Sequence, residues 1–235
     1  GLIDDYVNLK PVTRIILFSL VTYFFLIFNQ DFIVEYFYIK NIDNFFSLKL
    51  YSVFFTIFCF IFLQNSLNML DGINGSLSIY AILLTTIVIF LNPKLYYITF
   101  LFSLIICSLL NIRNKIFLGN NGAAIISFII SLLLIETHLI LPKQFSSEII
   151  LLICFLPAID MLRLFVQRIY KRKSPFTGDL NHFHHIVLFK KSNATWITLL
   201  MIIYLSLSLL ALFISVNIAF ILSIAIYFSL LWKFK

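Results

Sequence analysis

Residues 51–75 read YSVFFTIFCFIFLQNSLNMLDGING, an apolar run that closes with amides, a carboxylate and glycines. A helix that spans a bilayer needs about 20 apolar residues, and this run has that length. Asn65, Asn68 and Asp71 follow one another at i, i+3 and i+6, which keeps them near one face of a helix. The glycines that follow break the helix and let backbone approach a ligand closely. The stretch therefore predicts a membrane helix that delivers polar side chains to one membrane face.

Apolar runs of the same kind recur along the whole chain. The sequence is 62% hydrophobic and 11% charged, with a mean hydropathy of +1.05, which excludes an ordinary soluble domain. We predict an all-α fold, a polytopic membrane helical bundle that forms a single integral membrane domain over residues 1–235. About eight spans are expected, over residues 13–29, 51–70, 76–92, 95–111, 122–142, 148–169, 195–214 and 216–232.

Basic residues divide unequally between the two sides that these spans define. Thirteen of the 17 lysines and arginines fall on the side of residues 1–12, and four fall on the other. The positive-inside rule makes the first side cytoplasmic. Charge placed in this way favours anionic lipid headgroups of the bilayer or a phosphate substrate as partners, and no nucleic acid. Four polar clusters share the cytoplasmic side, namely residues 4–5, 65–75, 119–122 and 160–185.

Two of these clusters are short. Asp4 and Asp5 are adjacent carboxylates, and Mg²⁺ binds in proteins through one or two carboxylates together with substrate phosphates. A solvated pair beside the membrane is the alternative. Residues 119–122, GNNG, form a glycine-flanked turn before a helix, which can present backbone N–H groups to a phosphate. A plain turn is the alternative there.

The cluster at residues 160–185, DMLRLFVQRIYKRKSPFTGDLNHFHH, is the richest in chemistry. Its aspartate and arginine at i and i+3 are spaced for an ion pair. Three of the chain's four histidines lie within it, and histidines can bind Zn²⁺, donate to a phosphate or shuttle protons. Zinc is disfavoured because no cysteine lies nearby, and the basic residues alone would also suit an anionic-lipid anchor. The candidate residues here are Asp160, Arg163, Asp179, His182, His184 and His185.

Taken in order, these motifs resemble those of the polyprenyl-phosphate N-acetylhexosamine-1-phosphate transferases, and within them the undecaprenyl-phosphate GlcNAc-1-phosphate transferases. The family has a longer run of spanning helices, so about three are expected to be missing before Gly1. The matched motifs are GxxDD at residues 1–5, NxxNxxDGxxG at 65–75, DxxR at 160–163, Ser-Pro-Phe at 174–176 and DxxHxHH at 179–185.

The resemblance implies a reaction, a location and a cofactor. UDP-N-acetylhexosamine, such as UDP-GlcNAc, would react with undecaprenyl phosphate to give undecaprenyl-diphosphate-N-acetylhexosamine and UMP. The site would face the cytoplasm, in a multi-pass protein of the bacterial inner (plasma) membrane. The product would start a cell-surface glycan, in cell wall, O-antigen or lipopolysaccharide biosynthesis. Mg²⁺, or Mn²⁺ in its place, is the implied cofactor.

The resemblance also implies roles for single residues. Asn120 departs from the family, which usually has aspartate there; an amide oxygen can coordinate a metal but brings no charge. The implied catalytic residues are Asp4, Asp5 and Asp71, and the implied metal ligands are Asp71 and Asn68. The implied substrate-binding residues are Asn65, Asn68, Asn120, Arg163, Asp179, His182, His184 and His185.

Two other classes of protein stay open. One is a catalytically impaired fragment or pseudoenzyme that binds lipid or nucleotide, which the amide at Asn120 would suit. The other is a membrane transporter with a histidine-rich cytoplasmic gate. A transporter should also carry polar residues midway along its spans, whereas here they lie mostly at span ends. A homodimer, and direct attack against a covalent intermediate, are likewise left open by the sequence.

Overall fold

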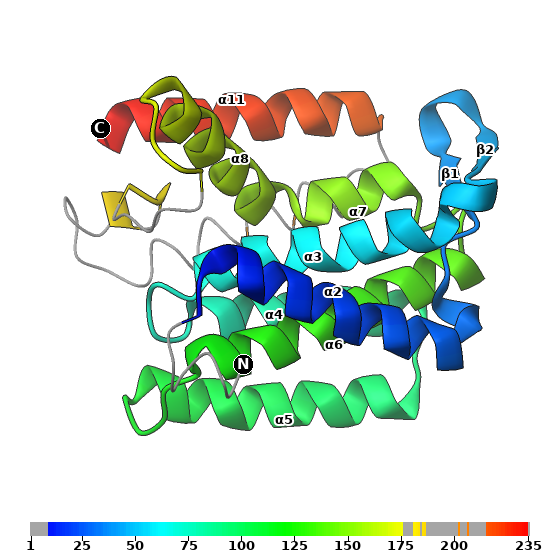
Figure 1. Ribbon diagram of the computed structural model, residues 1–235, viewed down its shortest axis with the longest axis horizontal. Helices are drawn as coiled ribbons and strands as arrows, with labels where there is room; N and C mark the ends of the chain where they lie inside the picture. The colour runs from blue at the N-terminus through cyan, green and yellow to red at the C-terminus, as the bar shows by residue number, and fades with distance from the viewer. Residues whose placement is uncertain are drawn as a thin grey trace.

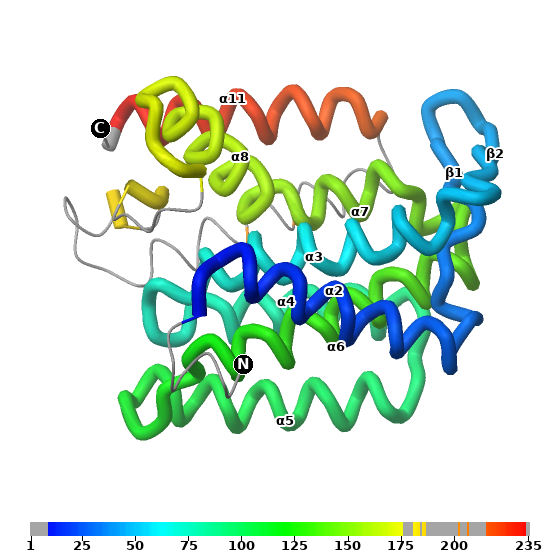
Figure 2. Tube along the Cα trace, in the orientation of Figure 1, coloured from blue at the N-terminus to red at the C-terminus, as the bar shows by residue number. Residues whose placement is uncertain are grey.

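The structure is a computed structural model that describes residues 9–175, 181–183, 185–186, 202, 206 and 215–234. Its helices run alongside one another in a bundle, with a small hairpin at one end (Figures 1 and 2). The helices are α2 (Pro11–Phe28), α3 (Ser52–Leu70), α4 (Ser76–Leu91), α5 (Leu95–Ile112), α6 (Gly119–Ile140), α7 (Ser147–Ile153), α8 (Phe155–Tyr170) and α11 (Val216–Phe234). The shorter elements are η1 (Gln30–Phe32), β1 (Tyr36–Ile39), η2 (Lys40–Ile42), β2 (Asn44–Ser47) and η3 (Lys49–Tyr51).

Five helices are long and apolar enough to cross a membrane, namely α2, α3 together with η3, α5, α6 and α11. The pair α7 and α8 passes the same test as one segment, but it is bent by 74°. Helix α4 is apolar and has 16 residues, and the expected span 195–214 falls almost wholly outside the described residues. The described part of the chain thus has five to six helices that can cross a membrane, which is fewer than the eight predicted.

The β-hairpin departs from the all-α prediction. Strands β1 and β2 pair antiparallel, with Tyr36 opposite Ser47. The carboxylate of Glu148, at the start of α7, accepts the backbone N–H groups of Lys40 at 2.8 Å and Asn41 at 3.1 Å. A carboxylate that accepts two backbone donors makes stronger hydrogen bonds than a neutral acceptor would. The hairpin is therefore fixed to α7 at this end of the bundle.

The bend between α7 and α8 follows from Pro157. Proline has no N–H, so it cannot donate to the carbonyl of Ile153, the fourth residue before it. The buried hydroxyl of Tyr80, on α4, donates to that carbonyl instead. The buried acceptor is thereby satisfied, and the bend is held against α4. The sequence reading of residues 148–169 as one span did not anticipate this break.

The core lies between α3, α4, α6 and the α7–α8 pair. Its largest fully buried apolar side chains include Leu67, Leu77 and Leu134. By contrast, large apolar side chains on α2, α5 and α11 remain exposed, for example Phe24 on α2 and Phe102 on α5. Exposed apolar side chains are stable in contact with lipid, so this distribution agrees with a membrane bundle.

Candidate functional site

The described parts of the polar clusters lie at the end of the bundle opposite the hairpin (Figure 1). Helices α3 and α5 end there, α4 and α6 begin there, and the last turns of α8 and α11 reach the same end. Four predicted site residues lie outside the described residues, namely Asp4, Asp5, Asp179 and His184.

A buried amide joins two loops at this end. Asn111, at the end of α5, is 1% exposed, and its Oδ1 accepts the backbone N–H of Gly75 at 2.5 Å. Its Nδ2 donates to the carbonyl of Ile116 at 3.1 Å. Asn74 and Asn114 add a direct amide link at 2.6 Å. The loop after α3 is thus tied to the loop before α6. Sequence reasoning missed Asn111, although a polar amide closing an apolar run was the available signal.

Gly75 is required by its backbone and by its surroundings. Its φ is +91°, and a Cβ there would lie 2.6 Å from Cγ1 of Ile112. We expect Gly75→Ala to destabilise the fold by about 1–3 kcal/mol, because it adds backbone strain and a steric clash. The midpoint of thermal unfolding in detergent measures this. Gly122→Ala is the control, since a Cβ at Gly122 meets only the Leu118 side chain, at 3.1 Å. Equal midpoints for the two variants would contradict the prediction.

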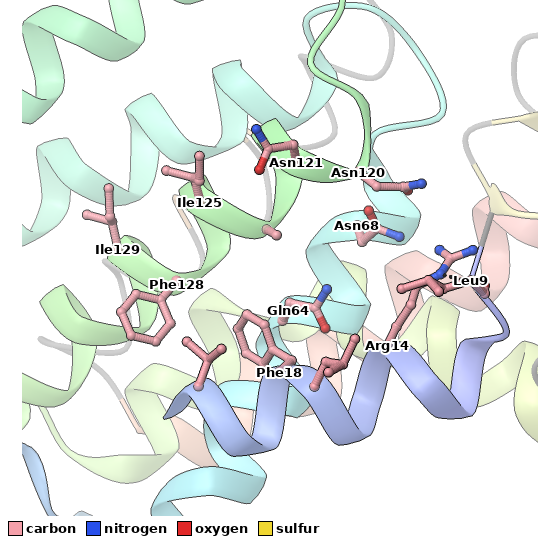
Figure 3. A pocket seen from close by; sticks show the side chains of 13 residues that line it. Leu9, Arg14, Phe18, Gln64, Asn68, Asn120, Asn121, Ile125, Phe128 and Ile129 are labelled. Atoms are coloured by element: carbon pink, nitrogen blue, oxygen red, sulfur yellow. Dashed lines mark hydrogen bonds between the residues drawn. The ribbon is translucent and has the colours of Figure 1, made fainter. Parts of the chain in front are cut away.

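A pocket of about 590 Å³ lies between α2, α3 and α6 (Figure 3). Its polar end contains Gln64 and Asn68 of α3, Asn120 and Asn121 of α6, and Arg14 of α2. In Figure 3 the side chains of Asn68 and Asn120 lie near each other at this end. The structure thus brings together two of the predicted site residues. It adds Gln64 and Arg14, which the motifs did not indicate.

The rest of the pocket is apolar and faces outward from the bundle. Leu17, Val21 and Ile125 line it and are all more than two-fifths exposed. The other apolar lining residues are Leu9, Phe18, Ala124, Phe128 and Ile129. A long apolar chain lying in the membrane can therefore contact these walls while a polar group at its end reaches the amides. The pocket has the two-part character that an amphiphilic ligand requires.

The glycine-flanked segment GNNG differs from the turn expected before a helix. Gly119 begins α6, with φ +61°, and Asn120 and Asn121 lie in the first turn of that helix. The first turn of a helix carries backbone N–H groups that have no partner within the helix, and the helix dipole places partial positive charge there. Both amide side chains line the pocket, and they do so from the N-terminus of a helix.

Asp71 immediately follows the last residue of α3. Burial raises the pKa of its carboxyl to about 7. No residue that the structure describes donates a hydrogen bond to this carboxylate. A cation would offset the cost of burying the charge, so the position suits a metal ligand. Asn65, one of the two amides in the same motif, instead turns back along α3 and donates to the carbonyl of Ile61 at 2.9 Å.

A second polar group lies where α8, α11 and residues 181–183 meet. The carboxylate of Asp160 is nearly buried and forms the ion pair with Arg163 that the spacing indicated, at 2.8 Å from Nη2. It also accepts the hydroxyl of Tyr227 at 2.8 Å, and the backbone N–H of Phe183 at 3.2 Å. Nδ1 of His182 lies 3.1 Å from its other oxygen. Because an ionised carboxylate only accepts, the shared proton belongs to Nδ1.

The ring of His182 is therefore held in place by the Asp160 carboxylate. The ring of His185 lies against that of His182, with 6.4 Å between the ring centroids. Arg163 also donates to the backbone carbonyl of Asn181 at 2.7 Å, which ties α8 to the start of this segment. Among the described residues, no group of three or more His, Cys, Asp or Glu is arranged to hold a metal ion. This end of the bundle thus offers cationic and amide groups suited to anionic phosphates.

Comparison with known proteins agrees with the motifs. The family model described as glycosyl transferase family 4 matches residues 1–138. An undecaprenyl-phosphate alpha-N-acetylglucosaminyl 1-phosphate transferase from Salmonella typhi is 29% identical over 150 residues, which are 59% of this chain and 41% of that protein. The protein of the same name from Escherichia coli K12 is 28% identical over the same shares.

A third relative covers more of the chain. The Thermotoga maritima protein of the same name is 27% identical over 208 residues, which are 88% of this chain and 63% of that protein. This chain therefore spans about two-fifths to three-fifths of the length of these relatives. The family match covers more than half of the chain and includes the DGxxG loop, the amide pair and the apolar pocket. On this evidence, the chain belongs to glycosyl transferase family 4, as its motifs predicted.

Proposed function

We propose that the chain transfers N-acetylhexosamine 1-phosphate from a UDP-sugar to undecaprenyl phosphate and releases UMP. The reaction takes place at the cytoplasmic face of a bacterial inner membrane and begins a cell-surface glycan. The names of the relatives support undecaprenyl phosphate as the acceptor and N-acetylglucosaminyl 1-phosphate as the group transferred. The observation that carries the proposal is the pocket between α2, α3 and α6, which joins exposed apolar walls to a polar end that contains Asn68, three residues before Asp71 in the same motif.

The pocket suits a lipid phosphate for a physical reason. Undecaprenyl phosphate has a long apolar chain and a charged head, so its site needs an opening toward the membrane and donors at one end. Leu17, Val21 and Ile125 line the opening toward the membrane, and the amides of Asn68 and Asn120 provide the donors. A soluble nucleotide alone would not need exposed apolar walls. The pocket therefore favours an enzyme that works on a lipid over one that works on two soluble substrates.

The oxygen donors of Asp71 and Asn68 fit Mg²⁺ better than Zn²⁺, because a carboxylate and an amide oxygen are ligands that Mg²⁺ prefers. Asp71 and Asn68 would hold the ion. When bound, Mg²⁺ would offset the charge of the sugar diphosphate and of the departing UMP. Asp4 and Asp5 would assist the attack of the lipid phosphate, either as a base or by orienting a cation. Asn65 would contribute to substrate binding from the same helix as Asn68. Arg163, Asp179, His182, His184 and His185 would hold phosphate or uridine groups.

A direct assay tests the proposal. The full chain in lipid nanodiscs is given UDP-GlcNAc or UDP-GalNAc, undecaprenyl phosphate and Mg²⁺, and UMP is measured. We expect UMP release that requires the lipid phosphate and is abolished by EDTA. Binding of UDP-GlcNAc without UMP release would instead favour the binding-only alternative. Release of UMP that does not depend on the lipid would overturn the assignment of the acceptor.

Asn120 offers a test of the metal-binding region. Asn120→Asp places a carboxylate at the polar end of the pocket, where one added charge in a partly dry site strengthens cation binding. We expect the Mg²⁺ concentration for half-maximal UMP release to fall about tenfold. Asn121→Asp is the matched control, because it adds the same charge to the same turn of α6. An equal shift in both variants, or none in either, would contradict a position of Asn120 next to the proposed metal site.

A further inference from the structure

The C-terminal helix α11 is packed on the α7–α8 pair, far along the chain from the polar motifs. Val216 and Ala219 pack against Leu152 of α7, and the ring of Phe220 meets that of Phe155, with 6.4 Å between centroids. Near the start of α11, Asn217 accepts the side-chain amide of Asn41 at 2.8 Å. These contacts hold the first turns of α11 against α7 and the start of α8, and Figure 1 shows α11 running beside the pair.

Tyr227 is the residue through which α11 reaches the site. Its side chain is 0% exposed. The hydroxyl donates to Oδ1 of Asp160 at 2.8 Å and accepts from Nε of Arg163 at 2.8 Å. Its ring lies 5.3 Å from that of Phe183, centroid to centroid. One side chain therefore contacts both members of the ion pair and the residue next to His182.

The position of Asp160 explains why these contacts matter. Its oxygens accept from His182 and from the backbone of Phe183, so the carboxylate positions these two residues. A carboxylate held by one neighbour on its own helix can still rotate. The hydroxyl of Tyr227 comes from a different helix and fixes the same oxygen from a second direction. His182 and Phe183 are thereby positioned by α11 as well as by α8.

We propose that Tyr227 is a positioning residue, which holds the Asp160–Arg163 pair so that His182 is aligned for the phosphate of the substrate. This inference rests on the proposed function. Tyr227 lies beyond residues 1–138, which the family model matches, and beyond the motifs, which end at residue 185. Tyr227 contacts both Asp160 and Arg163. Because the Asp160 carboxylate also accepts from His182, we expect the main effect of Tyr227 on the reaction to pass through Asp160 to His182.

The test uses Tyr227→Phe in the full chain, with two readouts. The first is hydrogen exchange of the peptide that covers residues 181–186. We expect about tenfold faster exchange, because the hydrogen bond of Tyr227 that steadies the acceptor of the Phe183 N–H is lost. This readout needs no activity, so it tests the contact even if the proposed function fails. The second is UMP release, for which we expect about a tenfold lower kcat with little change in the KM for UDP-GlcNAc.

Two comparisons separate positioning from general stability. Tyr97→Phe removes a buried tyrosine hydroxyl that donates to Glu136 at 2.7 Å, at the hairpin end of the bundle, and should change neither readout. In the His182→Ala background, Tyr227→Phe should have no further effect on UMP release, because the two residues act along one path. Unchanged exchange at residues 181–186 would overturn the contact. Additive losses in the double variant would overturn the path through His182.

Discussion

Asp71→Asn is expected to lower UMP release at least about a hundredfold while leaving membrane insertion unchanged. The carboxylate follows α3 at the polar end of the bundle, it is partly desolvated, and no described residue donates to it. Loss of its charge removes the carboxylate that we propose as a ligand of the metal ion. The substitution keeps the size of the side chain, so the helix end and the loop that Asn111 fixes should remain in place.

Asp43→Asn is the control for this experiment. It makes the same chemical change in the hairpin, at the opposite end of the bundle, and asparagine tolerates the φ of +46° found at that position. We expect UMP release close to that of the unaltered chain. If Asp71→Asn also retained near-normal release, then Asp71 would not belong to the site, and the metal would have to be held elsewhere.

The helices were predictable because their signal is local. The expected spans 51–70, 76–92 and 95–111 match α3, α4 and α5 to within a residue at each end. Runs of apolar residues closed by amides, glycine or proline fix these boundaries without tertiary contacts. The span expected at 122–142 begins earlier, at Gly119, because the amides of the GNNG segment continue into the first turn of α6 rather than forming a separate turn.

The departures have tertiary causes. The bend between α7 and α8 needs Pro157, but it also needs the hydroxyl of Tyr80 to satisfy the carbonyl that proline leaves. The hairpin needs Glu148, which lies more than a hundred residues after it in sequence and accepts its backbone N–H groups. Neither partner can be identified from a sequence pattern of short range, since each pair meets only after the bundle has formed.

The candidate site was predicted as a set of motifs on one side of the membrane, and the contacts between their side chains were not predicted. The sequence indicated Asn68, Asn120 and the Asp160–Arg163 pair. The structure places the two amides at the polar end of the pocket and the ion pair where α8 meets α11. It gave no sign of Tyr227, because a tyrosine in an apolar helix is ordinary. Only the fold shows that its hydroxyl meets Asp160.

Removing Asp160 is expected to cost the most stability of any change at this end. Asp160→Ala leaves the guanidinium of Arg163 largely buried without its carboxylate, and breaking such a pair destabilises a protein by about 3–5 kcal/mol. The side chains of Asp160 and Arg163 are 10% and 15% exposed, so solvent screens the loss and the lower end of this range is expected. Thermal unfolding in detergent, followed by the intrinsic fluorescence of the chain, measures the change.

The double variant decides whether the ion pair is the cause. Arg163→Met alone leaves the Asp160 carboxylate with its other donors, namely Tyr227, His182 and the Phe183 N–H. Asp160→Ala combined with Arg163→Met removes both charges, and we expect it to be more stable than Asp160→Ala alone, because no unpaired charge is left buried. UMP release should stay low in the double variant, since His182 and Phe183 have still lost their acceptor. Recovery of UMP release together with stability would show that the Asp160–Arg163 ion pair contributes to stability alone. His182 and Phe183 would then adopt their positions without it.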